Sequence, residues 1–236
     1  MSGINSKVSA YNVGSSRNYY SNHRRKLNDL YKSERYFLEP ALKKISSVLD
    51  VGCAAGGGLL FCKEANNQIE YTGIDVSREL INEAKKYVAN DSFYLYNGKI
   101  IPFKGKKFDL VFSLGVLHQI LDYKDIIKQM VAYAKEYIIF DLRLTKQKTL
   151  CDPNKYYQYL QFSKEDSSNV SVPYIVINQN ECISFLRNNF SDCKIDAYGY
   201  YSKLSFSTNI PYTEILMVSF KITKGSESPG VFFENF

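Results

Sequence analysis

The 236-residue sequence contains no tryptophan, two histidines and five cysteines, and it has no Cys-x-x-Cys pair. The cysteines are odd in number and scattered, at Cys53, Cys62, Cys151, Cys182 and Cys193. Structural zinc sites and disulfide frameworks depend on closely spaced or evenly numbered cysteines. The sequence therefore predicts reduced thiols, no metal centre and a cytoplasmic location.

Long apolar runs are also missing. No stretch approaches the roughly 18–20 apolar residues that are needed to span a bilayer. The N-terminal residues lack the charged-then-apolar order of a secretory signal. We therefore expect no insertion into a membrane, and we find neither an internal repeat nor a second-domain boundary.

Acidic residues are fewer than basic ones, and the formal net charge is +6. Clustered cations would favour a nucleic acid or an anionic substrate as a partner. Only residues 23–26 (HRRK) and 104–107 (KGKK) form small basic clusters here. We interpret both as solvated surface, so nucleic acid is not the expected partner.

The sequence does contain a regular alternation of short apolar runs and helical periodicity. Seven runs predict strands, at residues 46–51, 69–76, 92–97, 108–114, 137–144, 193–201 and 213–223. Helices are expected at residues 57–67, 77–90, 123–136 and 178–190, with Ser77 and either Asn178 or Asn180 as N-caps. Strands separated by helices imply a doubly wound, mostly parallel α/β sheet of seven strands. A ligand is then expected at the carboxyl ends of the strands.

We expect one domain over residues 1–236. Residues 1–45 would form a helical cap, and residues 46–144 the ligand-binding core. Residues 145–180 follow the fifth strand as an insertion that is too long for an ordinary connection. Residues 181–224 supply the last helix and strands, and residues 225–236 form a tail.

The stretch SVLDVGCAAGGGLL, residues 47–60, raises the question of which ligand its glycine-rich turn holds. Nucleoside triphosphates, dinucleotides and S-adenosylmethionine all bind such turns after a first strand. A triphosphate loop would end in Gly-Lys-Ser/Thr, which is missing here. The order is Asp50-x-Gly52-x-Ala54-x-Gly56, and a carboxylate at the strand end would repel a pyrophosphate. A ligand with a cationic end suits this turn better.

Four motifs in the same order resemble the class I S-adenosylmethionine-dependent methyltransferases of the small-molecule type. VLDVGCAAGG is similar to their first motif, D/E-x-G-x-G-x-G, with Ala54 in place of the middle glycine. YTGIDVS places Asp75 at the end of the second strand, FYLYNGKIIPF places Asn97 where the family usually has Asp, and FDLVFSLGVLHQI resembles the fourth motif. The resemblance covers residues 47–144 and implies a Rossmann-like core.

The resemblance also implies roles for individual residues. Asp75 would bind both ribose hydroxyls, Asn97 would accept from the adenine amino group, and Asp50 would contact the methionine amino group indirectly. Asp50 has a structural alternative, which is to bind the backbone amides of its own turn. The implied ligands are S-adenosyl-L-methionine and its product S-adenosyl-L-homocysteine. The cofactor-binding residues expected in full are Asp50, Gly52, Cys53, Ala54, Gly56, Asp75, Val76, Asn97, Gly98, Leu114 and Gly115.

His118, which follows the fourth predicted strand, is the candidate catalytic base. The alternative is that it packs beside the cofactor or caps the following helix. His23, beside Arg24 and Arg25, would reach the cofactor's carboxylate if the N-terminal helix folds over the site; a solvated helix face is the alternative. Six tyrosines are candidates for an acceptor pocket or for plain coverage of the insertion: Tyr156, Tyr157, Tyr159, Tyr198, Tyr200 and Tyr201.

The acceptor is constrained mainly by motifs that are missing. The [D/N/S]-P-P-[Y/F/W] motif of N-methyltransferases acting on bases and amides is replaced by Ser113-Leu-Gly-Val. The Pro-Cys pair of cytosine C5 enzymes is missing too. We therefore predict a bacterial enzyme, monomeric or homodimeric, that methylates a small molecule, with O-methylation of a sugar or metabolite ahead of N-methylation. The alternatives are an RNA methyltransferase and a non-catalytic S-adenosylmethionine-binding protein.

Overall fold

The computed structural model describes residues 19–86, 92–160, 170–226 and 230–234, with the backbone alone over residues 231–234. Residues 1–18 of the expected helical cap and residues 87–90 of one expected helix lie outside these ranges. None of the helices within them has both the length and the apolar character that crossing a bilayer requires.

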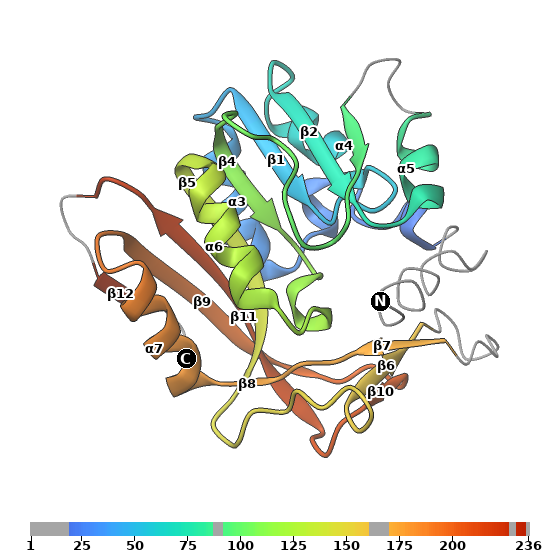
Figure 1. Cartoon of the computed structure of the whole chain (residues 1–236), viewed down its shortest axis with the longest axis vertical. Coiled ribbons are helices and arrows are strands. Elements are labelled where there is room, and N and C mark those ends of the chain that lie inside the picture. The colour runs from blue at the N-terminus through green and yellow to red at the C-terminus, as the bar shows by residue number, and fades with distance from the viewer. Residues whose placement is uncertain (1–18, 87–91, 161–169, 227–229, 235–236) are drawn as a thin grey trace.

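All seven strands expected from the sequence lie in one sheet (Figure 1). They are β1 (Ser47–Val51), β2 (Glu70–Asp75), β3 (Phe93–Leu95), β4 (Phe108–Ser113), β5 (Ala134–Thr145), β9 (Lys194–Lys203) and β11 (Glu214–Thr223). The first five run parallel in the order β3-β2-β1-β4-β5, and β11 then pairs antiparallel with both β5 and β9. The predicted doubly wound α/β fold is confirmed.

Two short strands enlarge this sheet beyond the seven. Strand β8 (Ile177–Asn178) pairs with the end of β5, and β12 (Gly230–Glu234) runs parallel to β9 at the sheet's edge. The sequence indicated only a tail at β12. An edge strand leaves backbone N–H and C=O groups unpaired, and residues 230–234 satisfy those of β9.

Helices cover both faces of the sheet (Figure 1). Leu49 and Val51 of β1 pack into one apolar cluster, with α6 (Tyr123–Tyr133) and α7 (Gln179–Asn189). Val48 points the other way into a second cluster with α3 (Lys32–Leu42), α4 (Gly57–Ala65) and α5 (Arg78–Ala84). This alternation follows from the two-residue period of a strand that is buried on both faces.

The predicted helix caps are present. The Ser77 side chain accepts from the Leu80 amide at the start of α5. Of the two candidates for α7, Asn178 is the cap, and its side chain accepts from the amides of Asn180 and Glu181. Each cap satisfies amides that the first helical turn leaves without partners.

Several boundaries differ from the predicted ones, among them the end of α5 at Ala84 and the junction of α6 with β5. Helix α6 ends at Tyr133, three residues before the expected end, and β5 begins at Ala134 instead of residue 137. Ala134 pairs with Phe108 at the start of β4, and the register then shifts before Leu110. Pairing with the neighbouring strand thus outweighs the helical periodicity of residues 134–136.

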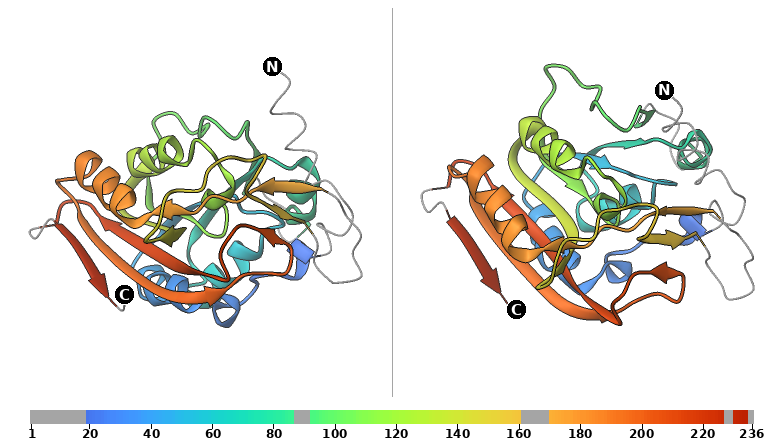
Figure 2. Two further views of the ribbon diagram at one scale, coloured as in Figure 1. Left: turned by 90° about the horizontal axis from the view of Figure 1, so that it is seen from below. Right: turned by 60° about the horizontal axis from the view of Figure 1, so that its bottom comes forward.

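The insertion after β5 forms part of a separate three-stranded sheet. It consists of β6 (Tyr157–Tyr159), β7 (Ser171–Pro173) and β10 (Thr208–Asn209), in the order β10-β6-β7. Figure 2 shows this small sheet beyond the ends of the parallel strands. Because β10 comes from the segment between β9 and β11, the insertion is tied to the C-terminal part of the chain.

Candidate active site

A cavity of about 640 Å³ lies between the carboxyl ends of the parallel strands and the small sheet. Its lining includes Asp50 from β1, Asp75 from β2 and Arg143 from β5, and on the opposite side Tyr159 from β6 and Val172 from β7. The volume falls in the range of about 300–1,000 Å³ that is usual for small-molecule sites. This is the edge of the sheet where the sequence placed the ligand.

The glycine-rich turn forms one wall of the cavity. Gly52 has φ +87°, and a Cβ there would lie 2.5 Å from Cγ2 of Val116. The amides of Gly52 and Cys53 both donate to the carbonyl of Ile74, at 2.8 and 3.0 Å. Gly52 therefore needs glycine both for its backbone conformation and for the close approach of the loop after β4.

Asp50 lies beside the first turn of α4. Its Oδ2 accepts from the Tyr71 hydroxyl at 2.6 Å. A Cβ on Gly58 would lie 2.3 Å from this oxygen, so the bare backbone of α4 packs directly against the carboxylate. Among the described residues, the hydrogen bond to Asp50 comes from Tyr71, and the amides of Gly52 and Cys53 in its own turn donate to the Ile74 carbonyl instead.

Burial raises the pKa of Asp50 to about 7, although the hydrogen bond from Tyr71 lowers it. A carboxyl group that is taken out of water loses hydration, which disfavours its charged form. The start of a helix favours a negative charge nearby, and so does a cationic ligand. Asp50 is thus a group whose ionisation depends on what occupies the cavity.

Asp75 accepts a hydrogen bond from a backbone amide of the glycine-rich turn, which is the kind of contact considered as an alternative for Asp50. Its Oδ2 accepts from the amide of Ala54 at 2.9 Å, and its Oδ1 accepts from the amide of Ser77 at 2.9 Å. Burial raises the pKa of Asp75, and these amides oppose the shift. A carboxylate has about four acceptor positions, so each oxygen retains a lone pair for a further donor.

Asn97 follows β3 at the exposed end of the cavity. Its Oδ1 accepts from the amides of Lys99 and Ile100, both at 2.9 Å, and so shapes the next turn. Gly98 has φ +73°, and a Cβ there would lie 3.1 Å from Cγ1 of Val76. The oxygen predicted to bind adenine therefore already holds its own loop.

The loop after β4 is held by a buried carboxylate on β5. The Gly115 amide donates to Oδ1 of Asp141 at 2.5 Å, and Oδ2 of Asp141 pairs with Nη1 of Arg143. The Asp141 and Arg143 side chains are 2% and 5% exposed. Because they are two residues apart on one strand, both side chains lie on the same face of β5.

A second buried ion pair comes from the N-terminal segment. Arg24 Nη2 lies 2.8 Å from Oε1 of Glu34, and the guanidinium also lies over the Tyr31 ring, 5.0 Å from its centroid. A Cβ on Gly57 would lie 2.6 Å from the Arg24 carbonyl oxygen. The N-terminal segment thus crosses the glycine turn, as the sequence proposed for His23 and its neighbours. His23 and Arg24 line the cavity.

His118 lies on the short 3₁₀ helix η3 (Leu117–Gln119) and is 5% exposed. Its ring is in edge contact with Tyr174, with 5.1 Å between centroids. Among the described residues, its Nδ1 has no hydrogen-bond partner. Burial, followed by the charge of Arg143, holds the pKa of His118 well below its usual range. The imidazole is therefore uncharged at neutral pH and faces the cavity.

Nearly all of the predicted site residues line this cavity. Gly56 is the exception: it has φ +84°, caps α4, and would place a Cβ 2.9 Å from the Phe93 ring. Cys53 is buried, and burial raises the pKa of its thiol well above its usual value. It is a small residue of the turn with no reactive thiolate. The predicted residues in the lining are Asp50, Gly52, Cys53, Ala54, Asp75, Val76, Asn97, Gly98, Leu114, Gly115 and His118.

For most of the six candidate tyrosines, the structure does not place the side chain in the cavity lining. Of the six tyrosines proposed, only Tyr159 lines the cavity. Tyrosines elsewhere in the sequence do so instead, together with charged residues from β5 and the N-terminal segment. The missed lining residues with polar side chains include Tyr19, Tyr20, Tyr31, Tyr96, Tyr174, Arg143 and Gln158.

No metal centre is indicated in the part of the chain that the structure describes. His, Cys, Asp and Glu side chains there do not gather into a group that could hold an ion. The free cysteines are likewise not paired with one another.

Comparison with known proteins finds similarity to methyltransferases. Residues 49–136 match a family model described as a methyltransferase domain. The ubiquinone biosynthesis O-methyltransferase of Coxiella burnetii (strain Dugway 5J108-111) is 30% identical over 105 residues, covering 43% of this chain and 44% of that protein. The chain thus matches less than half the length of this curated relative.

Two solved structures share the fold. An S-adenosylmethionine-dependent methyltransferase from Clostridium acetobutylicum ATCC 824 has a TM-score of 0.53 at 16% identity, covering 83% of this chain and 92% of that chain. The plantazolicin methyltransferase BpumL, in complex with a pentazolic desmethylPZN analog and SAH, has a TM-score of 0.57 at 16% identity, covering 92% and 93%. The fold is the class I, Rossmann-like methyltransferase fold.

Proposed function

We propose that this chain, which carries a methyltransferase domain of the class I Rossmann-like fold, transfers a methyl group from S-adenosyl-L-methionine to a small-molecule acceptor. The observation that carries the proposal is the pair of buried carboxylates, Asp50 and Asp75, on either side of a bare glycine turn that opens into the cavity. Such a pair suits a ligand with one cationic end and one diol, and it disfavours a pyrophosphate.

Asp75 would bind the ribose hydroxyls through the lone pairs left over by the Ala54 and Ser77 amides. Asp50, with Gly58 packed against it, would face the cationic methionine end. Arg24 is the candidate partner for the methionine carboxylate, because its guanidinium is near Gly115 and its backbone crosses the glycine turn. Gly52, Cys53, Ala54, Val76, Gly98, Leu114 and Gly115 would shape the wall around the cofactor.

The bound cofactor supplies an activated methyl group on a sulfonium, so the protein mainly has to orient the acceptor and exclude water. His118 is the candidate base for a hydroxyl acceptor. Its imidazole is uncharged, and its Nδ1 lacks a partner among the described residues. A neutral nitrogen beside a cavity can accept a proton from a bound hydroxyl.

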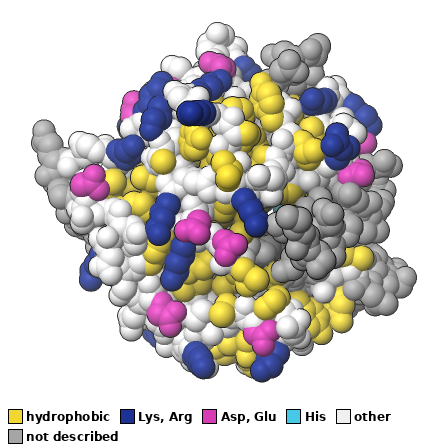
Figure 3. Space-filling model, viewed as in Figure 1, with side chains coloured by type: hydrophobic (Ala, Val, Ile, Leu, Met, Phe, Trp, Pro, Cys, Tyr) yellow, Lys and Arg dark blue, Asp and Glu magenta, His cyan; other side chains and the backbone are white. Residues whose placement is uncertain are grey.

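A small acceptor is favoured over RNA by the shape and by the surface. The cavity is lined by residues from both sheets. On the face seen in Figure 3, Lys and Arg side chains are interspersed with hydrophobic and acidic ones instead of forming one continuous patch. O-methylation is preferred to N-methylation, in keeping with the O-methyltransferase name of the curated relative. We further propose a cytoplasmic protein, supported by its free cysteines.

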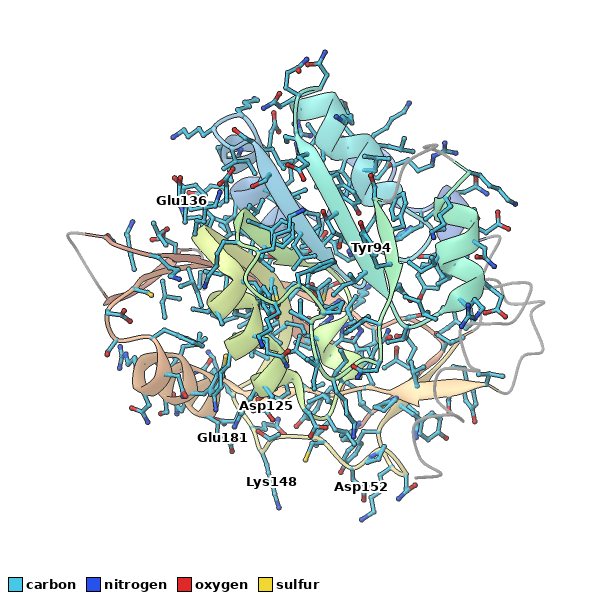
Figure 4. The ribbon with its side chains drawn as sticks, turned by 45° about the horizontal axis from the view of Figure 1, so that its top comes forward. Tyr94, Asp125, Glu136, Lys148, Asp152 and Glu181 are labelled. Carbon is cyan, nitrogen blue, oxygen red and sulfur yellow. The ribbon has the colours of Figure 1, made fainter. Side chains whose placement is uncertain are left out.

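Calorimetry with S-adenosyl-L-homocysteine and with NAD tests the cofactor assignment. We expect the first to bind and the second not to bind. Asp75→Asn should weaken the binding by about 10- to 150-fold, since a hydrogen bond to a charged group contributes about 1.5–3 kcal/mol. Asp125→Asn, the same change on an exposed residue of α6, is the matched control (Figure 4).

Binding of NAD in place of S-adenosyl-L-homocysteine would overturn the proposal. A screen of small acceptors with labelled S-adenosyl-L-methionine tests turnover. Cofactor binding without transfer to any small molecule or RNA would point to a non-catalytic binder. Transfer to RNA, together with salt-sensitive RNA binding, would instead favour an RNA methyltransferase.

A further inference from the structure

The part of the cavity that faces the small sheet, here called the acceptor compartment, has an apolar wall beside polar side chains. It is formed by the end of β5, by the small sheet and by the facing ends of β9 and β11. Its apolar wall includes Leu160, Val172, Leu204, Ile215 and Met217. Such walls favour the hydrophobic body of a ligand over a molecule with hydroxyls on every side.

The Arg143 guanidinium is a buried cation of this lining, whereas Lys203, which also lines the cavity, is exposed. The Arg143 side chain is 5% exposed. Within the described residues, Arg143 forms an ion pair from Nη1 to Oδ2 of Asp141. A guanidinium carries five N–H donors in a planar fork, so donors remain for a further acceptor. The Tyr174 hydroxyl lies close enough for Arg143 to act on its pKa by charge and hydrogen bonding.

The negative charge beside Arg143 is that of Asp141, which also has other partners. Asp141 accepts from the Gly115 amide as well as from Arg143, and Arg24 also lies near enough to affect its pKa. Arg24 is paired with Glu34 and is the candidate partner of the methionine carboxylate. Because Asp141 is shared among these donors, the Arg143 guanidinium retains donors for a bound anion.

His118 supplies a second and independent sign of a ligand. Its imidazole is 5% exposed, it lines the same cavity, and Nδ1 has no partner among the described residues. Buried polar atoms almost always have a hydrogen-bond partner. An unpartnered nitrogen beside Arg143 and Tyr174 is therefore explained if the hydroxyl of the acceptor, from which His118 is proposed to take a proton, lies there.

We propose that Arg143 is the specificity-determining residue for the acceptor, and that the acceptor is a small molecule with a hydrophobic body and a carboxylate. The carboxylate pairs with the free donors of the Arg143 guanidinium, next to Tyr174 and His118. The hydrophobic body occupies the apolar part of the compartment. The inference rests on the proposed function, because it concerns the second substrate of the same site.

The compartment has a further polar position away from this corner. The Thr208 hydroxyl oxygen, on β10, is buried without a hydrogen-bond partner among the described residues, and Thr208 lines the cavity. An acceptor with a second hydrogen-bonding group would satisfy it. The acceptor class is thus a hydrophobic monocarboxylate that also bears a hydroxyl, carbonyl or similar group.

The test uses the full chain saturated with S-adenosyl-L-homocysteine, and measures the binding of benzoate, cinnamate and 2-naphthoate against their primary amides. Each amide matches its acid in shape but has no charge. We expect at least one carboxylate to bind about tenfold or more tightly than its amide, as a charge-assisted hydrogen bond predicts.

Arg143→Gln alone would leave Asp141 buried without its ion pair, so the informative variant is Asp141→Asn/Arg143→Gln, which removes both charges. Its preference for the carboxylate should vanish, and its retained affinity for S-adenosyl-L-homocysteine reports that the cavity is formed. Arg143→Lys keeps the charge without the planar fork and should retain part of the preference. Arg187→Gln, on the exposed side of α7, is the matched control and should retain all of it.

The outcomes separate the two proposals. Failure of the wild-type chain to bind S-adenosyl-L-homocysteine would refute the proposed function. Normal binding of that ligand, with amides binding as well as carboxylates or with neither binding, would overturn the inference about Arg143. A carboxylate preference that survives in the double variant would overturn it as well.

Discussion

Replacing Asp50 with asparagine tests whether folding raises the pKa of this carboxyl group, so that its ionisation destabilises the folded chain. The side chain is 5% exposed, and its Oδ2 accepts from the Tyr71 hydroxyl at 2.6 Å. An asparagine oxygen can accept the same hydrogen bond, and the two side chains are nearly equal in size. The substitution therefore removes the charge while it preserves the packing against Gly58.

The expected size of the effect follows from the pKa of Asp50, which burial raises from 3.8 to about 7. At low pH the carboxyl is protonated in both states. As the pH rises, the unfolded chain ionises first, so unfolding releases a proton and stability falls until the pH passes the folded-state pKa. Over the whole interval this is about 4 kcal/mol, and between pH 5 and pH 8 about 3 kcal/mol, since one pKa unit corresponds to about 1.4 kcal/mol.

Urea unfolding of the unliganded protein at pH 5, 6, 7 and 8 measures this difference. We expect the stability of Asp50→Asn relative to the wild type to increase by about 3 kcal/mol from pH 5 to pH 8. The contributions of other titrating groups cancel in the comparison. Asp125→Asn, on the exposed first turn of α6, is the control and should follow the wild type throughout (Figure 4).

Parallel pH profiles for wild type and Asp50→Asn would refute the reasoning, because they would mean that Asp50 ionises as easily in the folded chain as in the unfolded one. The same variant should bind S-adenosyl-L-homocysteine more weakly than the wild type. A gain in stability with a loss of affinity is expected where a buried charge serves the ligand instead of the fold.

Two further substitutions and one titration test the surroundings of this site. Gly58→Ala should lower the affinity for S-adenosyl-L-homocysteine by tenfold or more, because its Cβ would lie 2.3 Å from Asp50 Oδ2; calorimetry showing an unchanged affinity would contradict this close approach. Tyr71→Phe should destabilise the chain by about 1–3 kcal/mol in urea unfolding, since it removes the partner of a buried carboxyl; a difference within error would contradict it. Neither histidine should titrate between pH 5.5 and pH 8 in NMR spectra of histidine-labelled protein, because burial lowers the pKa of His23 to about 4 and that of His118 well below its usual range; a midpoint near pH 6.5 for either ring would contradict the burial argument.

The cofactor half of the site was predictable because its residues are local to strand ends. Asp50 and Asp75 each end an apolar run, and parallel strands bring their carboxyl ends to one edge. The turn that follows Asp50 contains Gly52 and Gly56, whose positive φ favours glycine. The identity of the Asp50 partner was not predictable, because Tyr71 lies on the neighbouring strand and its hydroxyl meets Asp50 only through the β1–β2 register.

The acceptor half depends on contacts between distant segments. Strand β10 pairs with β6 across about fifty residues of chain, and neither segment has a periodic pattern. Arg24 reaches Glu34 and the Gly115 loop only in the folded chain. One signal was present in the sequence: Asp141 and Arg143 lie two residues apart within an apolar strand. Buried charges are rarely left unpaired, so that spacing indicates an ion pair on one face of β5.

The buried charges behind the cavity also constrain how this protein can diverge. Arg24 pairs with Glu34, and Asp141 pairs with Arg143, in side chains that are at most 14% exposed. Loss of one member leaves its partner charged and buried, at a cost of about 3–5 kcal/mol, whereas loss of both is tolerated. In an alignment of homologous sequences, Asp141 and Arg143 should therefore covary. Homologues that lack both residues should methylate a different acceptor.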